Sequence, residues 1–317
     1  MGGAAVSASF YCVADDRYFL GAVGLVNSLR LVGHTEPIHL LDCGLSDPHR
    51  ARLEPHVELG EAPADAPPWL LKTVLPLSRP APVALLLDVD MLVTRSLREL
   101  IDRAADRRVV AFRNPLDRFD PEWGELLDLG PTRRRRYMSS GAIALDGELA
   151  RELLALMADR QDRVDFDRTH WRRREEGYPF TYADQDVFNA ILATRIDPGR
   201  VVELDERLAP TPPFEGLRLV DERSLRCSYD DGVEPYLVHH HTIKPWLEPT
   251  HHGIYSRLLR RLLVGDDLAI TLPASEIPLR LRTGLRALAE RKRINARERF
   301  RWHVREPISH RIASRRR

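Results

Sequence analysis

Residues 83–87 carry the strongest structural signal in the chain. They are five consecutive apolar residues, and Asp88, Val89 and Asp90 follow them directly. A short run of this kind is typical of a strand buried on both faces, as in a parallel sheet. Ligands of open α/β sheets bind beyond the carboxyl ends of such strands. We therefore expect the two carboxylates to lie at the mouth of a ligand site.

Short apolar runs alternate with stretches of helical periodicity along the chain. Strands are predicted at residues 9–13, 38–41, 83–87, 109–112, 142–145 and 236–238, and helices at 21–31, 47–53, 69–77, 183–193 and 252–263. Residues 198–234 are rich in Pro, Asp and Glu and give no clear order. Strands that alternate with helices predict an α/β protein with a mostly parallel sheet flanked by helices.

Composition excludes several classes of protein. The 317 residues are 43 % hydrophobic and 30 % charged, which is ordinary for a soluble globular protein. No apolar run approaches the roughly 18 residues that a membrane-spanning helix needs. Cys12, Cys43 and Cys227 are odd in number and widely spaced, so they predict no disulfide framework and fit a reducing, cytoplasmic setting.

Basic residues are concentrated at the C-terminal end. From residue 277 onward, 14 Arg or Lys stand against three Glu, although the whole chain carries a net charge of only +1. Leu279, Leu285, Phe300 and Trp302 lie among these arginines. Such a stretch favours an anionic membrane surface, with a solvated helix as the alternative and nucleic acid as the least favoured partner. We expect a catalytic domain over residues 1–265 and a basic helical extension over 266–317.

The Asp88-x-Asp90 pattern is one of three in the chain. Residues 165–167 lie in a polar stretch and residues 184–186 on a predicted helix. Only Asp88 and Asp90 follow a buried strand, where alternate side chains point the same way and can reach one hard cation. Such a cation could neutralise a diphosphate leaving group. A solvated turn at the end of the strand is the alternative.

Four further segments stand at predicted strand or helix ends. They are Asp15-Asp16-Arg17-Tyr18, Ser139-Ser140-Gly141, Asp184-Gln185-Asp186 and Lys244-Pro245-Trp246 behind a run of three histidines. Each has an ordinary structural explanation, such as a helix cap or a turn. Their order and spacing, however, resemble those of glycosyltransferase family 8, the retaining GT-A enzymes that include glycogenin and bacterial lipopolysaccharide or lipooligosaccharide galactosyl- and glucosyltransferases.

This resemblance covers about residues 10–263. It implies a Rossmann-like GT-A fold and a metal-dependent transfer of a hexose from a nucleotide-sugar, a UDP-sugar, to a saccharide or glycolipid acceptor. It also implies lipopolysaccharide biosynthesis on the cytoplasmic side of a membrane, with retention at the anomeric carbon. The rival function is a non-catalytic nucleotide-sugar-binding protein with the same fold.

The resemblance assigns roles to individual residues. Contacts with the nucleotide-sugar are implied for Asp15, Arg17, Tyr18, Lys72, Asp88, Val89, Ser139 and Lys244. Gln185 would lie near the anomeric carbon, and Asp184 would hold hydroxyls of the donor sugar. Because Gln185 is a poor nucleophile, we favour attack on the same face with the leaving phosphate as the base, and Asp184 is the alternative nucleophile. Asn114 falls where relatives contact the acceptor.

The metal ligands implied are Asp88, Asp90 and one histidine. The family's histidine lies six residues before the lysine of Lys-Pro-Trp, where this chain has Val238. A deletion of one residue brings His239 into place, His241 shares its face, and His240 should point away. Two aspartates and an imidazole suit Mn²⁺ better than Mg²⁺. A zinc site built from the histidines and a purely structural role are the alternatives.

One departure from the family pattern concerns the donor sugar. Ser139-Ser140-Gly141 stands where the family has Asn-x-Gly. A short hydroxyl thus replaces an amide near the donor, so the resemblance leaves the identity of the donor sugar open.

Overall fold

A computed structural model describes residues 6–63, 70–241, 243–249 and 253–300, with side chains up to residue 297. The fold divides into two compact units, each built from separate stretches of sequence. The first unit takes its residues from 1–19, 33–89 and 96–209, and the second from 20–32, 90–95 and 210–317. One boundary of the two units falls after Val89, within the Asp88-Val89-Asp90 segment that follows the apolar residues 83–87.

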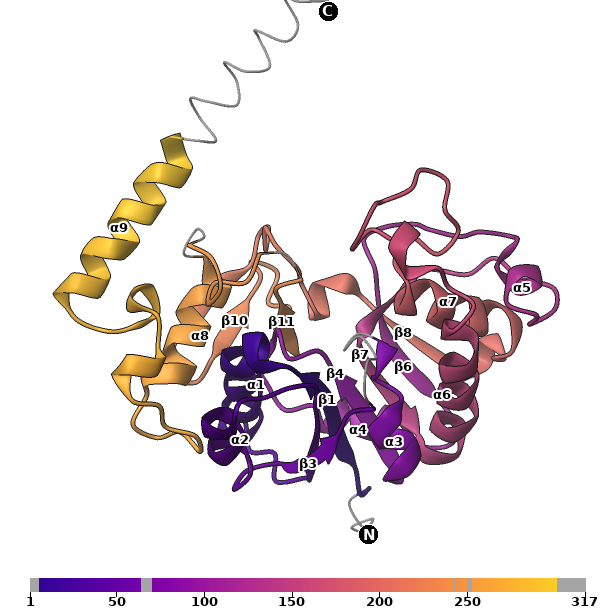
Figure 1. Ribbon diagram of the computed structural model, residues 1–317, viewed down its shortest axis with the longest axis horizontal. Coiled ribbons are helices and arrows are strands. Elements are labelled where there is room, and N and C mark those ends of the chain that lie inside the picture. Colours follow the sequence, from indigo (N-terminus) through magenta and orange to yellow (C-terminus); the bar gives the residue numbers. More distant parts are fainter. Residues whose placement is uncertain (1–5, 64–69, 242, 250–252, 301–317) are drawn as a thin grey trace, which may run out of the picture. The chain divides into compact units, whose positions relative to one another are not determined.

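A seven-stranded sheet forms the centre of the first unit (Figure 1). Its strand order is β3-β2-β1-β4-β7-β6-β8. The strands are β1 (Ser9–Ala14), β2 (Ile38–Asp42), β3 (Glu58–Glu61), β4 (Val83–Leu87), β6 (Val109–Arg113), β7 (Met138–Asp146) and β8 (Val201–Leu204). All neighbours are parallel except β7, which runs antiparallel to β4 and β6. The predicted α/β fold with a mostly parallel sheet is therefore confirmed.

The predicted strand at residues 83–87 is β4, the central strand of this sheet. All five residues are buried, with Leu85 opposite Phe10 of β1 and Leu86 opposite Ile143 of β7. Because β1 and β4 are parallel neighbours, the residues that follow them leave the sheet at the same edge. This arrangement brings Asp15 and Asp88 to one edge, as the sequence predicted.

Six helices are described in the first unit. They are α2 (Asp47–Leu53), α3 (Val74–Ser78), α4 (Arg98–Ala104), α5 (Trp123–Leu126), α6 (Gly147–Gln161) and α7 (Asp184–Thr194). Leu153 of α6, Phe188 of α7 and Ile143 of β7 belong to one buried hydrophobic cluster. Figure 1 shows α6 and α7 next to each other beside β6 and β7. This packing fixes the start of α7 relative to β7.

Helix α3 is shorter than predicted. The sequence predicted a helix over residues 69–77, but α3 spans Val74–Ser78 and contains Pro76 in its first turn. Proline is tolerated there, because the N–H it lacks would have no partner within the helix. Residue 69 lies outside the described residues. Lys72 consequently stands in a turn ahead of the helix rather than within it.

The second unit contains two small antiparallel pairs of strands. β5 (Met91–Val93) pairs with β11 (Leu237–His239), and β9 (Arg218–Asp221) pairs with β10 (Arg226–Ser228). β8, β9 and β10 lie in the stretch 198–234 that the sequence left unordered. The predicted strand at 236–238 is found one residue later.

Two helices of the second unit pack together (Figure 1). They are α1 (Phe19–Leu31), of which residues 20–31 belong to this unit, and α8 (Ile254–Val264). The buried Asn27 side chain donates to the carbonyls of Leu262 and Ile270, both at 2.9 Å, and accepts from the Ile270 N–H at 2.8 Å. One side chain thus ties α1 to α8 and to the segment beyond it.

The basic C-terminal stretch contains the helix α9 (Leu285–Phe300). Leu285 is 85 % exposed and Leu288 is 42 % exposed, so this helix presents leucines to solvent. Residues 301–317, with Trp302, lie outside the described residues. None of the helices in the described part of the chain has the length and apolarity needed to cross a membrane. A separate domain over 266–317 stays a prediction.

We predict that Asn27→Ala lowers the free energy of unfolding by about 2–4 kcal/mol, because it leaves buried backbone groups of Leu262 and Ile270 without partners. Urea denaturation followed by circular dichroism measures the change. Asn114→Ala is the control, because the Asn114 side chain accepts one hydrogen bond, from Leu116 N–H, in an exposed turn. Equal effects of the two substitutions would contradict the role of Asn27.

Candidate functional site

Residues 15–18 form a short 3₁₀ turn at the end of β1. Asp15 caps it by accepting the Tyr18 N–H at 3.0 Å, and Asp16 forms an ion pair with His49 at 2.6 Å. Arg17 is exposed and Tyr18 is half-buried. The capping role of Asp15 therefore exists in the structure, and it places Arg17 and Tyr18 just beyond the end of β1.

Lys72 bridges two of the predicted site carboxylates. Its Nζ lies 2.8 Å from Asp88 Oδ1 and 3.0 Å from Asp184 Oδ2. Burial alone would lower the pKa of Lys72, but the charges of Asp184 and Asp88 outweigh burial and raise its pKa. Lys72 therefore stays protonated and neutralises part of the negative charge that follows β4.

The start of α7 faces β7 through side-chain contacts. Ser140 Oγ donates to Asp184 Oδ2 at 3.0 Å, and the Ser140 N–H donates to Gln185 Oε1 at 3.2 Å. Ser139, the residue predicted to contact the donor, accepts from the Gly141 N–H at 3.4 Å, and its contact with a donor stays a prediction. Ser140 thus contacts both residues at the start of α7, which the sequence did not indicate. Side chains alternate along β7, so only the register of the strand decides which serine faces α7.

Asp90 is a buried carboxylate with a histidine and a lysine as neighbours in the second unit. His239 Nε2 lies 3.1 Å from Asp90 Oδ1, and Lys244 Nζ donates to Asp90 Oδ2. Burial would raise the pKa of Asp90, but His239 and Lys244 hold it far below the usual value of an aspartate. Asp90 is therefore an anion within the interior.

The pairing of β5 with β11 brings these residues together. His239 lies opposite Met91, the residue that follows Asp90, and the His240 N–H donates to the Asp90 carbonyl at 3.1 Å. Lys244 also donates to the His240 carbonyl at 2.5 Å. The sequence placed Asp90, one of the three histidines and Lys244 in one site, and the structure brings them into contact.

The three histidines have different surroundings. The His240 ring packs edge-on against Tyr255 at 4.9 Å, and burial together with the charge of Lys244 lowers the pKa of His240 to about 4. His241 is exposed, with its ring 5.7 Å from that of His239. Among the three, His239 is the histidine that lies against Asp90. The sequence also gave His239 as the first choice.

Asp88, Asp90 and His239 can each offer one ligand atom, and these three atoms lie within 4.8 Å of one another. Asp90 Oδ1 is buried, and its contact with His239 Nε2 at 3.1 Å lacks the geometry of a hydrogen bond. A buried carboxylate oxygen without a well-aligned donor is costly unless a cation binds it. Two carboxylates and one imidazole therefore form a donor set that fits a divalent metal ion.

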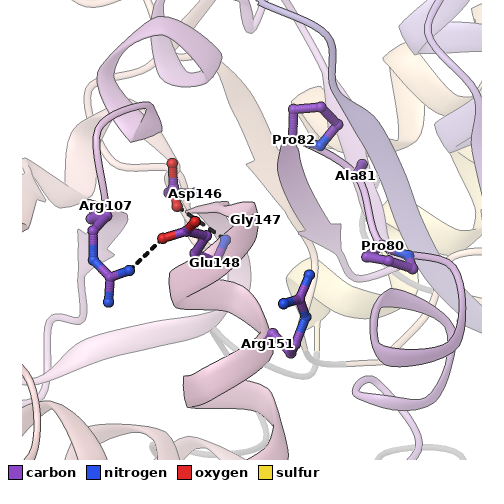
Figure 2. Close-up of a pocket in the computed structure, with 8 residues that line it drawn as sticks. All are labelled: Pro80, Ala81, Pro82, Arg107, Asp146, Gly147, Glu148 and Arg151. Atoms are coloured by element: carbon purple, nitrogen blue, oxygen red, sulfur yellow. Dashed lines mark hydrogen bonds and ion pairs between the residues drawn. The ribbon is translucent and has the colours of Figure 1, made fainter.

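A pocket of about 390 Å³ lies elsewhere in the first unit (Figure 2). Pro82 and Asp146 line it, and these residues stand where β4 begins and β7 ends. Arg107 lines it too, with its guanidinium engaged by Glu148 at 2.5 Å. Asp88 follows the other end of β4, about 17 Å away along the strand. This pocket is therefore separate from the predicted site.

The fold is that of glycosyltransferases. LgtC, solved as an active-site mutant with a glutamine changed to glutamate, is similar at a TM-score of 0.55 and 18 % identity, covering 84 % of this chain and 98 % of LgtC. The galactosyltransferase LgtC in complex with donor and acceptor sugar analogues gives a TM-score of 0.53 at the same identity and coverage. The glycosyltransferase fold expected from the resemblance is thus confirmed.

The bifunctional glycosyltransferase WbbM, in its apo form, is also similar in structure. Its TM-score is 0.54 at 15 % identity, and the match covers 83 % of this chain and 50 % of WbbM. No family model matches the sequence, and no curated protein matches it. At these identities, the likeness to LgtC and WbbM establishes the fold.

We predict that Lys72→Met tightens the binding of Mn²⁺ in the absence of nucleotide by about tenfold. Lys72 holds a positive charge against Asp88, so a metal ion that binds Asp88 must compete with it. Isothermal titration calorimetry with Mn²⁺ alone measures the affinity.

Lys292→Met on α9 is the matched control, because it removes the same charge from an exposed position. Its affinity for Mn²⁺ should equal that of the wild type. Unchanged or weaker binding in Lys72→Met would show that Lys72 does not oppose the metal.

Proposed function

We propose that this chain is a metal-dependent glycosyltransferase that transfers a hexose from a UDP-sugar to a saccharide or glycolipid acceptor. The observation that carries this proposal is the buried carboxylate of Asp90 beside His239 and Lys244. This set of residues, in a glycosyltransferase fold, fits a site for a metal ion and a diphosphate. The alternative is a protein of the same fold that binds a nucleotide-sugar without reaction.

The metal would be held by Asp88, Asp90 and His239, with Mn²⁺ preferred over Mg²⁺ because one ligand is an imidazole. Such an ion supplies positive charge to the diphosphate as the glycosidic bond breaks. Lys72 and Lys244 would add to this positive charge, since Lys72 contacts Asp88 and Lys244 contacts Asp90. Two lysines near a leaving diphosphate stabilise the developing negative charge.

The remaining residues would orient the donor. Asp15, Arg17 and Tyr18 would bind the uridine and ribose, with Val89 and Ser139 as further contacts. Asp184 would accept hydrogen bonds from hydroxyls of the donor sugar. Its Oδ2 already accepts from Ser140 and contacts Lys72, so both neighbours would hold it in place.

The proposed reaction retains the configuration at the anomeric carbon. The acceptor hydroxyl attacks from the face that the diphosphate leaves, and a phosphate oxygen takes its proton. Gln185 would lie beside the anomeric carbon, where its amide can stabilise positive charge but cannot form a stable ester. Asp184 as a covalent nucleophile is the alternative, and its contact with Lys72 at 3.0 Å speaks against it, because an ion pair makes a carboxylate less nucleophilic.

We predict that the wild-type protein with Mn²⁺ releases UDP from one member of a UDP-hexose panel when a saccharide acceptor is present. Asp90→Asn should lower this rate at least about 100-fold, because it removes a charged ligand. A coupled assay for nucleoside diphosphate measures the rate, and NMR of the product gives the anomeric configuration.

Asp167→Asn is the matched control, because Asp167 belongs to the exposed Asp165-x-Asp167 pattern. Its rate should equal that of the wild type. If the protein binds a UDP-sugar but turns over none of the donors, it is a nucleotide-sugar-binding protein. Release of UDP without an acceptor would indicate a hydrolase. A product with inverted configuration would refute retention.

We further propose that the basic C-terminal stretch binds the anionic inner face of a membrane, where a glycolipid acceptor would be found. Arginines and exposed leucines alternate on and before α9, including Leu279 at 41 % exposure and Leu285 at 85 %. Such a surface can insert leucines among the headgroups while its charges bind anionic lipid. Nucleic acid stays the less favoured partner.

We predict that the protein co-sediments with vesicles containing phosphatidylglycerol but not with pure phosphatidylcholine vesicles. The triple change Arg286→Glu, Lys292→Glu and Arg297→Glu should weaken binding more than tenfold, since each basic residue contributes about 1 kcal/mol at an anionic surface.

Reversal of three exposed arginines of the first unit, Arg172, Arg173 and Arg174, is the matched control for net charge. This variant should keep most of the vesicle binding. Equal loss in both triple variants would indicate attraction by net charge alone and contradict a role for α9.

A further inference from the structure

Asp186 is a completely buried carboxylate two residues beyond Asp184. Its Oδ1 accepts from Arg118 Nε at 2.9 Å and from the Tyr137 hydroxyl at 2.5 Å. Its Oδ2 accepts from the Tyr182 N–H at 2.8 Å. Both oxygens are thus occupied by protein donors, so Asp186 is not available to react with a sugar.

Arg118 comes from the segment between β6 and α5 and is itself fixed in place. Its Nη2 donates to the Pro179 carbonyl at 2.6 Å, and Trp123 Nε1 donates to the same carbonyl at 2.8 Å. One guanidinium therefore joins the carboxylate of Asp186 to the backbone of the loop that leads into α7. No other cation among the described residues pairs with Asp186.

The backbone between that loop and α7 is strained. Ala183 has φ of +45°, in a region that residues with a Cβ rarely adopt, and it is buried. Such a conformation persists only where the surrounding contacts hold it. Here the Tyr182 N–H and the Arg118 side chain both bind Asp186, so the contacts on either side of Ala183 meet at one carboxylate.

The direction of the next two side chains depends on this turn. Asp184 and Gln185 follow Ala183 directly, and they meet the hydroxyl and the N–H of Ser140. A second tie, from Asn189 to the Met138 backbone at 2.7 Å and 2.8 Å, holds the following turn of α7 to β7. It does not involve Asp186, so loss of Arg118 should release the first turn of α7 and leave the rest.

We propose that Arg118 is a positioning residue for the transfer reaction: through Asp186 it holds the turn at Ala183 and so keeps Asp184 and Gln185 in place for the donor sugar. The inference rests on the proposed function and adds to it. It gives the two acids of the Asp-Gln-Asp segment different roles, with Asp184 facing the donor and Asp186 facing Arg118.

The test compares Arg118→Ala, Arg118→Lys and the control Arg134→Ala. Arg134 is on a nearby segment, and among the described residues it pairs with exposed Asp117 at 3.2 Å. We expect kcat/KM for transfer to fall about 100-fold in Arg118→Ala, as a displacement of about 1 Å can cause, and less in Arg118→Lys. The affinity for UDP, which lacks the sugar, should stay within about twofold.

Chemical rescue distinguishes positioning from a general loss of structure. The Arg118 side chain is 26 % exposed, so guanidinium can enter the space left in Arg118→Ala. Guanidinium at non-denaturing concentration should raise the kcat of Arg118→Ala at least about tenfold. It should not raise the kcat of the wild type or of Arg134→Ala. Tyr137→Phe, which removes the second donor to Oδ1, should show a smaller loss of kcat.

Wild-type activity in Arg118→Ala, or loss of UDP affinity in parallel with kcat, would overturn the positioning role. If Arg118→Ala does not fold, Arg118→Lys and Tyr137→Phe give the same comparison. If the wild type transfers no sugar, the proposed function fails. Crystal structures of the wild type and Arg118→Lys would still test whether Arg118 holds Asp184 and Gln185 in position. A Gln185–Ser140 contact kept in Arg118→Lys and Tyr137→Phe would then contradict the inference.

Discussion

The buried charge of Asp90 is the interaction on which the second unit's part of the site depends. A carboxylate in the interior is stable only with hydrogen-bonding or charged partners or with a metal ion. His239 and Lys244 supply such partners, and the register of β5 against β11 brings them there, with Leu237 opposite Val93 and His239 opposite Met91. A shift of one residue would turn the His239 ring to the other face. The pairing of two three-residue strands thus decides whether this site exists.

The first unit meets the same electrostatic requirement with a different segment. Asp88 and Asp184 carry like charges, and Lys72 lies between them at 2.8 Å and 3.0 Å. Lys72 reaches both because α3 begins only at Val74, which leaves the lysine in a turn. The position of Pro76, suited to a first turn, is the local cause. In each unit a lysine thus holds a site carboxylate, Lys72 beside Asp88 in the first and Lys244 beside Asp90 in the second.

Local signals predicted the central parts of the fold and the site. Residues 83–87 are apolar throughout, which is enough to indicate a buried strand and to place Asp88 at its end. The alternation of side chains on a strand was enough to turn His240 away, and the spacing to Lys244 put His239 before His241. An apolar run does not encode its direction, so neither the antiparallel β7 nor the contact of Ser140 with α7 could be predicted. Arg118 lies in a segment without periodicity, and nothing local connects it to Asp186.

Helix geometry explains why Asp184 and Asp186 serve different purposes. Each residue of an α-helix turns by about 100°, so two side chains that are two residues apart point about 200° apart. At the start of α7 one acid must therefore face the core when the other faces Ser140. The buried acid requires donors, which Arg118, Tyr137 and the Tyr182 N–H provide. Their contacts in turn hold Ala183 in its strained conformation, so the donors that compensate the burial of Asp186 also orient Asp184 and Gln185.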